Sequence, residues 1–328
     1  MSTVETDSPS TRTSSPDDNP CELCGGRRFE IIARRDRRGR PLETAICLGC
    51  GLVAHAKIPS DEELAEYYAR HYRSEYHAES SPSAKRVMRA WKNGRRILRQ
   101  LGPFLRGDEK VFEVGAGIGC TVKVFERAGF DASGIEPGEG FQRFGREQLR
   151  ARVDRGSLFE QTGEARYDLV LLIHVIEHFN SPSRALKTIH RLVRPHGRLY
   201  LECPNLAAPF AAPGRLFHVA HVYNFTPWTL LALAAKCGFE LETWLSEPHD
   251  SNLEVLLRWV EQGREDLDPL GCSRTKERLA CYSTLTYHLR TGYLANRLRK
   301  VASYLWEQWA ARRFVGRLCA ECARPGTS

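Results

Sequence analysis

Residues 111–119 have the sequence VFEVGAGIG, and this stretch decides the fold class. An apolar run with one acid, Glu113, leads into a turn with glycine at Gly115, Gly117 and Gly119. Such a turn between a strand and a helix lets a ligand approach the bare backbone, while the helix N-terminus offers its amide groups. The dinucleotide-binding form, GxGxxG, would place its last glycine where Cys120 stands. The stretch therefore predicts a strand–loop–helix unit that differs from the dinucleotide-binding form.

The next predicted strand ends in an acid, Glu136, which lies 21 residues after Gly115. A carboxylate at that place can accept both ribose hydroxyls of a nucleoside. A neutral glycine loop between the acids Glu113 and Glu136 suits a cationic amino-acid nucleoside better than a pyrophosphate. The alternative is a tight turn followed by a solvated glutamate.

From residue 110 onward, short apolar runs alternate with helical segments, which is typical of parallel βαβ units. We predict an α/β fold with an open, doubly wound, Rossmann-like sheet of about seven strands. The predicted strands include 111–114, 132–135, 169–173, 199–203, 239–244 and 253–260, and the helices lie near 119–128, 139–150, 183–194 and 227–237.

Two CxxC pairs precede this region, Cys21 with Cys24 and Cys47 with Cys50, and each pair is followed by glycine. Tetrahedral zinc needs four soft ligands that converge from two tight turns, so the spacing predicts a zinc ribbon with a hairpin between the pairs. Four unrelated buried thiols are the alternative. We expect the zinc to stabilise a small module, although it could also shape a substrate entrance. Cys319 and Cys322 lack a partner pair, and we interpret them as reduced cysteines on one helical face.

The composition is that of a globular protein, with 42% hydrophobic and 27% charged residues. No apolar run approaches the roughly 20 residues that span a bilayer, and the N-terminus lacks the apolar segment of a signal peptide. We therefore expect a cytoplasmic protein whose cysteines stay reduced. The predicted organisation is a disordered leader at 1–19, the ribbon at 20–56, a helical N-terminal cap at 57–108, the sheet domain at 109–262 and a basic helical extension at 263–328.

Further motifs follow the glycine loop in order: GIEP at 134–137, YDLVLLIHVIEHF at 167–179 and LVRPHGRL at 192–199. The ordered set resembles the class I methyltransferases that use S-adenosylmethionine. With the ribbon ahead of it and HVAHVYNFTP at 218–227 behind it, the chain resembles zinc-ribbon-bearing methyltransferases of sugar and cell-surface glycan pathways. The resemblance implies a methyltransferase that acts on a hydroxyl or carbon of a sugar or related small molecule.

The resemblance also implies which residues bind the cofactor. At the position of the usual Asp-Leu pair beside the adenine, this chain departs from the family pattern with a serine. The implied residues are Glu113, Gly115, Ala116, Gly117 and Gly119 on the methionine side, Glu136 on the ribose, Ser157 and Leu158 near the adenine, the backbone of His174 near the ammonium, and Tyr72 or Tyr76 closing over the cofactor.

On the acceptor side, a hydroxyl or acidic carbon needs a base, and histidine suits neutral pH because its ordinary pKa is about 6.5. We expect His221 with Tyr223 to serve there, and His178 as the second choice. Each histidine could instead be a packed or helix-capping side chain.

Residues 174–178 also spell HxxEH, the inverted zinc-protease signature, which needs both histidines on one face of a helix. His174 here follows a predicted strand, which argues against a protease. One zinc per chain would fit a ribbon alone, whereas two would favour the protease.

The competing function is an RNA methyltransferase whose arginine-rich ribbon grips nucleic acid. Against it stands the HVAHVYNFTP segment at 218–227, which resembles small-molecule enzymes, together with the distribution of charge. Residues 276–328 hold ten basic and three acidic residues, an excess of seven out of a net charge of +8. The rest of the chain is therefore close to neutral and has no evident polyanion-binding surface.

The C-terminal extension has apolar residues at helical spacing: Leu294, Leu298, Val301, Leu305 and Trp309. Three interpretations stay open. The helix could dock on the domain with a solvated basic face, rest on anionic membrane near a lipid-linked acceptor, or form a homodimer contact.

Overall fold

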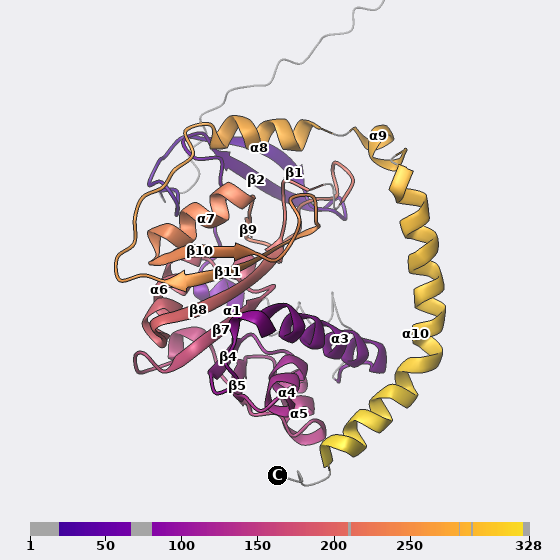
Figure 1. Cartoon of the computed structure of the whole chain (residues 1–328). Helices are drawn as coiled ribbons and strands as arrows, with labels where there is room; N and C mark the ends of the chain where they lie inside the picture. Colours follow the sequence, from indigo (N-terminus) through magenta and orange to yellow (C-terminus); the bar gives the residue numbers. More distant parts are fainter. Residues whose placement is uncertain (1–19, 67–80, 209–210, 282, 290, 324–328) are drawn as a thin grey trace, which may run out of the picture.

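The computed structural model describes residues 20–66, 81–208, 211–281, 283–289 and 291–323. The predicted leader and the tyrosines Tyr72 and Tyr76 lie outside these residues. Two sheets organise the described chain: a seven-stranded sheet in the order β10-β11-β8-β7-β4-β5-β6, and a four-stranded sheet in the order β1-β2-β3-β9 (Figure 1).

The seven-stranded sheet confirms the predicted Rossmann-like fold. Its strands β6, β5, β4, β7 and β8 run parallel, while β11 pairs antiparallel with both β8 and β10. The sequence analysis did not predict β6, a short strand in which only Val153 is apolar. The strand bounds are β4 Lys110–Val114, β5 Asp131–Glu136, β6 Val153–Arg155, β7 Tyr167–Ile173, β8 Val193–Pro204, β10 Phe239–Trp244 and β11 Asn252–Trp259.

Helices cover both faces of this sheet. The longer helices are α3 (Ala84–Leu101), α4 (Cys120–Arg127), α5 (Glu139–Gln148), α6 (Pro182–Leu192) and α7 (Pro227–Lys236). Apolar side chains of α6 and α7 share one core with one face of the strands, while those of α3, α4 and α5 share a second core with the other face. Shorter pieces are α1 (Asp61–Glu66), α8 (Gly271–Ala280), α9 (Thr284–His288) and the 3-10 turns η2 (Gly102–Phe104), η3 (Leu158–Glu160) and η4 (Ile176–His178).

The ribbon region forms the smaller sheet. The predicted hairpin is β1 (Phe29–Arg35) and β2 (Pro41–Cys47), followed by β3 (Val53–His55). A strand from far along the chain, β9 (Tyr223–Asn224), completes the sheet by pairing antiparallel with β3. The segment that carries His221 is therefore attached directly to the ribbon.

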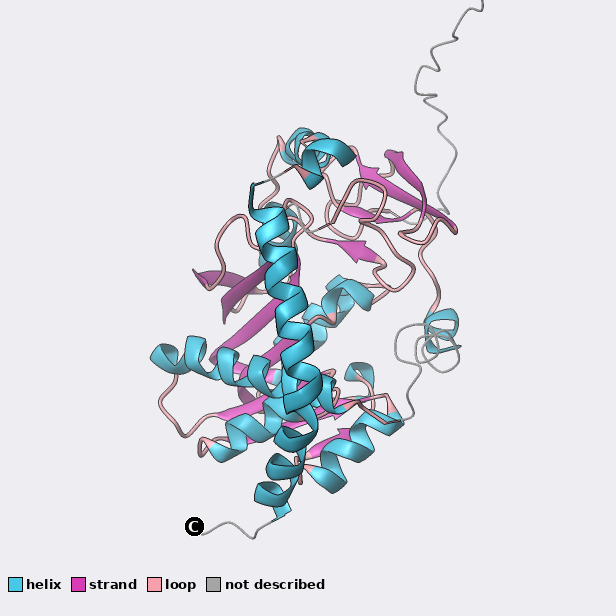
Figure 2. Cartoon of the chain, turned by 90° about the vertical axis from the view of Figure 1, so that its right-hand side faces the viewer, coloured by secondary structure: helices cyan, strands magenta, loops and turns pink. Residues whose placement is uncertain are grey.

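The C-terminal helix α10 (Thr291–Ala323) crosses α3, against which it packs, and continues toward α4 and α5 (Figures 1 and 2). Ala311, Leu318 and Cys322 are buried, and Glu307 forms an ion pair with Arg89 at 2.7 Å. Of the predicted apolar stripe, Trp309 is 66% exposed, whereas the side chains of Leu294, Leu298, Val301 and Leu305 lie outside those that the structure describes. None of the helices in the described ranges combines the length and apolarity that crossing a bilayer requires.

Candidate cofactor and acceptor site

The glycine loop follows β4 at the carboxyl edge of the sheet. Gly115, Gly117 and Gly119 all have positive φ, between 53° and 75°, a region that disfavours other residues. A Cβ atom on Gly115 would come within 2.6 Å of Val175, so the loop packs tightly against the segment that follows β7. A Cβ on Gly117 would have no neighbour within 4 Å among the described residues. The loop is therefore packed on one side and open at Gly117, as a ligand cradle requires.

Glu136, at the end of the adjacent strand β5, is bound to this loop. One carboxylate oxygen, Oε2, accepts a hydrogen bond from the Gly117 amide at 2.9 Å, and Oε1 accepts one from the Gly138 amide at 2.7 Å. The side chain is half-buried. Its carboxylate is thus held beside the open part of the loop, where it can accept ribose hydroxyls.

Glu113 lies beneath the loop and is only 4% exposed. Its Oε2 has no hydrogen-bond partner among the described residues. Burial raises the pKa of Glu113 to about 8. A buried acid with an unsatisfied oxygen fits the cationic end of the predicted cofactor, because an ammonium group would favour its ionised form.

The remaining cofactor candidates lie along the same edge. The Ala116 amide donates to the carbonyl of Ile135 at 2.8 Å, which ties the loop to β5. Leu158 is buried in η3, just after β6. Ser157 begins this turn in a capping box with Glu160, whose carboxylate accepts a hydrogen bond from the Ser157 amide at 2.8 Å. A contact between Ser157 and an adenine stays a prediction.

His174 follows β7 with a positive φ of 53°. Its amide donates to the carbonyl of Glu202 at 2.8 Å, and its ring lies 3.2 Å from the Glu202 carboxylate and 3.5 Å from that of Glu177. Burial lowers its pKa, but the two carboxylates outweigh that effect and raise it. The side chain therefore joins two buried acids, and the residue follows β7 at the same carboxyl edge of the sheet as the glycine loop.

Glu177 lies at the centre of the acceptor-side candidates and is 1% exposed. Neither carboxylate oxygen has a hydrogen-bond partner among the described residues. The Nε2 atoms of His178 and His221 both lie 4.0 Å from its Oε1. The Nδ1 of His178 donates to the carbonyl of Ala220 at 2.6 Å. The structure thus brings His178 and His221 together around an acid that the sequence analysis had not assigned to the site.

His221 and Tyr223 differ in their surroundings. Burial, with the neighbouring imidazoles of His178 and His218, lowers the pKa of His221 well below its usual value, so the ring is neutral at pH 7. Tyr223 is 3% exposed, and its hydroxyl donates to the carbonyl of Asn180 at 3.3 Å. Burial raises the pKa of Tyr223. The proton-accepting roles of His221 and Tyr223 stay predictions.

The HxxEH residues do not share a helix face. His174 follows a strand, whereas Glu177 and His178 form a 3-10 turn. This arrangement differs from the helix that the protease signature needs.

The four ribbon cysteines converge. Their Sγ atoms lie within 4.8 Å of one another, with Cys21 and Cys50 at 3.6 Å and Cys24 and Cys47 at 3.5 Å. Thiolates around tetrahedral zinc lie about 3.8 Å apart, so these residues could hold one zinc ion. The Gly26 amide donates to the Cys24 sulfur at 3.4 Å, as expected for a thiolate ligand.

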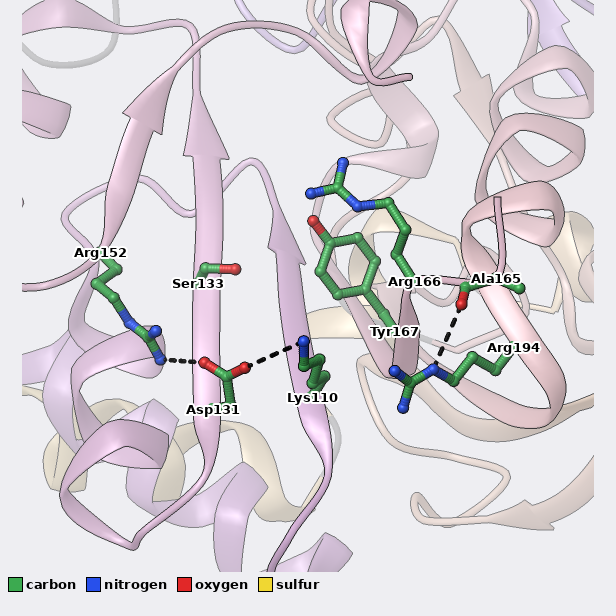
Figure 3. Close-up of a pocket in the computed structure, with 8 residues that line it drawn as sticks. All are labelled: Lys110, Asp131, Ser133, Arg152, Ala165, Arg166, Tyr167 and Arg194. Carbon is green, nitrogen blue, oxygen red and sulfur yellow. Dashed lines mark hydrogen bonds and ion pairs between the residues drawn. The ribbon is translucent and has the colours of Figure 1, made fainter. Parts of the chain in front are cut away.

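A surface hollow of about 460 Å³ lies at the opposite edge, where β4, β5 and β7 begin (Figure 3). It is lined by Lys110, Arg152 and Arg194 among others. Acids bind its cations, with Arg152 on Asp131 at 2.7 Å and Lys110 on the same carboxylate at 3.8 Å. Its lining holds four cationic side chains and one acid, Asp131, and it is separate from the glycine loop.

Sequence reasoning missed two buried acids, Glu177 and Glu202. Glu202 accepts hydrogen bonds from Arg96 at 2.6 Å and from Tyr200 at 2.9 Å. The available signal was an acid within the apolar run at 199–203, which a buried strand accepts only when the charge is paired.

Comparisons with known proteins agree with this geometry. Residues 83–244 match the family model described as a methyltransferase domain. An uncharacterized protein of Mycobacterium tuberculosis is 28% identical over 109 residues, which is 30% of this chain and 37% of that protein. The ubiquinone biosynthesis O-methyltransferase of Pseudomonas aeruginosa is 30% identical over 104 residues, which is 30% of this chain and 45% of that protein. The chain thus spans less than half the length of these curated relatives.

Among solved structures, 1,6-didemethyltoxoflavin-N1-methyltransferase from Burkholderia thailandensis, with bound S-adenosylhomocysteine, is 21% identical with a TM-score of 0.47. The match covers 71% of this chain and 99% of that one. The sheet order and the family match together show that residues 83–244 have the Rossmann-like fold of methyltransferase domains.

Proposed function

We propose that the protein is an S-adenosylmethionine-dependent methyltransferase that acts on a small-molecule acceptor. The observation that carries this proposal is the arrangement of three groups around one loop. Gly117 is open, Glu136 is held beside it by two backbone amides, and Glu113 lies beneath it with an unsatisfied oxygen. A cationic amino-acid nucleoside would satisfy all three groups.

When bound, this cofactor supplies an activated methyl group on a sulfonium. The chain's own residues bind the cofactor and orient it. Glu136 accepts the ribose hydroxyls, Glu113 offers negative charge to the ammonium group, and the His174 backbone borders the same edge. Exclusion of water and alignment of the acceptor are then the main requirements for transfer.

On the acceptor side we propose His221, with His178 as the second candidate, to receive the proton of a hydroxyl or acidic carbon. Both rings face Glu177, and a neutral imidazole can accept a proton. The 30% identity to an enzyme named as an O-methyltransferase supports transfer to oxygen. A sugar or glycan acceptor is our finer proposal, and it rests on the resemblance of the motifs.

We further propose one structural zinc on Cys21, Cys24, Cys47 and Cys50. The convergence of the four sulfurs supports it. Because β3 pairs with β9, the ion would stabilise the sheet that carries the acceptor histidine segment.

The test uses purified protein, methyl-labelled cofactor and fractionated cell extract. Label in nucleotide sugars, lipid-linked glycans or other small molecules supports the proposal, and label in RNA overturns it in favour of the competing function. Glu136→Ala should weaken binding of S-adenosylhomocysteine about 30-fold, because two hydrogen bonds to the ribose are worth about 2 kcal/mol. Glu247→Ala, on an exposed loop, is the matched control. Equal affinity of Glu136→Ala and Glu247→Ala for S-adenosylhomocysteine would contradict the proposed cofactor site.

A further inference from the structure

We propose that Glu177, His178 and His221 bind a divalent transition-metal ion on the acceptor side, at a site distinct from the cysteine cluster. The inference rests on the proposed function, because it assigns a ligand to the side of the site where the acceptor would bind. Their ligand atoms lie within 4.8 Å of one another.

The first observation is the state of Glu177. Both carboxylate oxygens are buried and lack a hydrogen-bond partner among the described residues. A buried carboxylate is costly unless a cation or several donors compensate it. The nearest cationic side chain, His174, lies 3.5 Å away and is shared with Glu202, whose other partners include Arg96. The negative charge of Glu177 is therefore compensated only in part, and a further cation beside it would be stabilised.

The second observation is the orientation of the imidazoles. A carbonyl oxygen can only accept, so His178 Nδ1 donates its hydrogen to Ala220. In the neutral ring, Nε2 is then the atom with a lone pair, and it faces Glu177 Oε1 at 4.0 Å. Metal-binding histidines are commonly oriented by such a hydrogen bond from the other ring nitrogen to a carbonyl. Two electron-rich atoms facing each other at this distance suit an intervening cation.

The third observation is the distance set. Nitrogen and oxygen ligands lie about 2.1 Å from such an ion, so around a tetrahedral centre they are about 3.4 Å apart. The distances from Glu177 Oε1 to the two Nε2 atoms are 4.0 Å, and they need to shorten by about 0.6 Å. Rotation of the two imidazole side chains by this amount leaves the backbone hydrogen bonds of the segment in place.

The donor set indicates the kind of ion. Two imidazoles and one carboxylate bind zinc, iron(II), cobalt(II) and manganese(II), and they leave open positions for an exogenous ligand. The substrate class that fits is an acceptor with an oxygen donor, such as a diol or a hydroxy acid. With an ion present, His178 and His221 act as ligands in place of the proton-accepting role proposed above, and the ion sets the acidity of the acceptor hydroxyl.

Manganese(II) tests the site in the zinc-loaded full-length protein, because it disfavours thiolate ligands and leaves the cysteine cluster undisturbed. The signal of free Mn²⁺ in electron paramagnetic resonance counts the bound ions. We expect one Mn²⁺ per chain in the wild type, affinity lower by about tenfold or more in Glu177→Gln and His221→Ala, and no change in Glu247→Gln. Titration with Co²⁺ should add an absorption band of the bound ion, without the sulfur-to-cobalt charge-transfer absorption that thiolate ligands produce.

Two results would overturn the inference: no ion bound beyond the one in the cysteine cluster, or equal Mn²⁺ binding by the wild type and Glu177→Gln. The first would mean that His174 alone neutralises Glu177. Thermal unfolding and binding of S-adenosylhomocysteine are measured for each variant, and Glu177→Gln preserves side-chain shape. If the protein binds the cofactor but no second ion, only the metal-site proposal is wrong. If it binds the ion but not the cofactor, the proposed function is wrong.

Discussion

Glu113 gives the sharpest quantitative prediction. Its ordinary pKa is 4.5, and burial raises the value to about 8. At 1.36 kcal/mol per unit, ionising this acid in the cofactor-free protein costs up to about 5 kcal/mol. At pH 7 the side chain is therefore about 90% protonated before a ligand binds. An ammonium group placed beside it would favour the carboxylate, and the proton would leave.

Binding of S-adenosylhomocysteine at pH 7 should then release about 0.9 proton from Glu113, falling to about 0.5 at pH 8. Calorimetric titrations in buffers of different ionisation enthalpy measure this number. Glu113→Gln should bind more weakly and should lose this release. If the variant and the wild type release the same number of protons at both pH values, Glu113 does not face the ammonium.

The same shift has a consequence for stability. Between about pH 4.5 and pH 8 the folded protein binds more protons at Glu113 than the unfolded chain does. The contribution of this group to the free energy of unfolding therefore falls as the pH rises through that window. Urea unfolding at pH 5 and pH 8 should show a smaller decline for Glu113→Gln than for the wild type. An identical decline would contradict the raised pKa.

Four further outcomes are expected. Gly117→Val places a side chain in the open part of the loop and should weaken cofactor binding at least about tenfold by calorimetry, whereas Gly129→Val, also at an open positive-φ glycine, should not. Cys47→Ser should lose the zinc in elemental analysis and lower the unfolding temperature; a full zinc count would refute the ribbon ligands. His221→Ala should lower kcat while cofactor affinity stays within about threefold, and an equal loss of cofactor binding would make the residue structural. If the C-terminal helix rests on anionic membrane, vesicle flotation should be salt-sensitive and should disappear on truncation after Arg274; absence of flotation at low salt leaves docking or dimerisation.

The part of the fold that sequence could predict is the part encoded locally. The apolar runs around Val111 and Leu169 indicate strands because parallel strands are buried on both faces. The glycine loop is equally local, since its positive φ values restrict the residues at Gly115, Gly117 and Gly119. β6 escaped prediction because three residues with one apolar side chain leave no periodic pattern.

The acceptor side could be predicted only in part, because it depends on contacts between distant segments. HVAHVYNFTP identified His221 as a candidate, but nothing local shows that Tyr223 pairs with Ala54 or that the Ala220 carbonyl accepts a hydrogen bond from His178. Glu177 was visible within HxxEH, yet its unsatisfied carboxylate is a property of the packed structure.

The placement of β9 links the two candidate metal sites to one structural element. β3 begins three residues after the last ribbon cysteine, and it pairs with β9, which begins two residues after His221. His55 of β3 also donates its amide to Val222 at 2.9 Å, between His221 and β9. An isolated two-residue strand has little stability of its own, so the ribbon sheet fixes its position. The cysteine cluster therefore contributes to the acceptor side through backbone hydrogen bonds, although its sulfurs form a separate cluster.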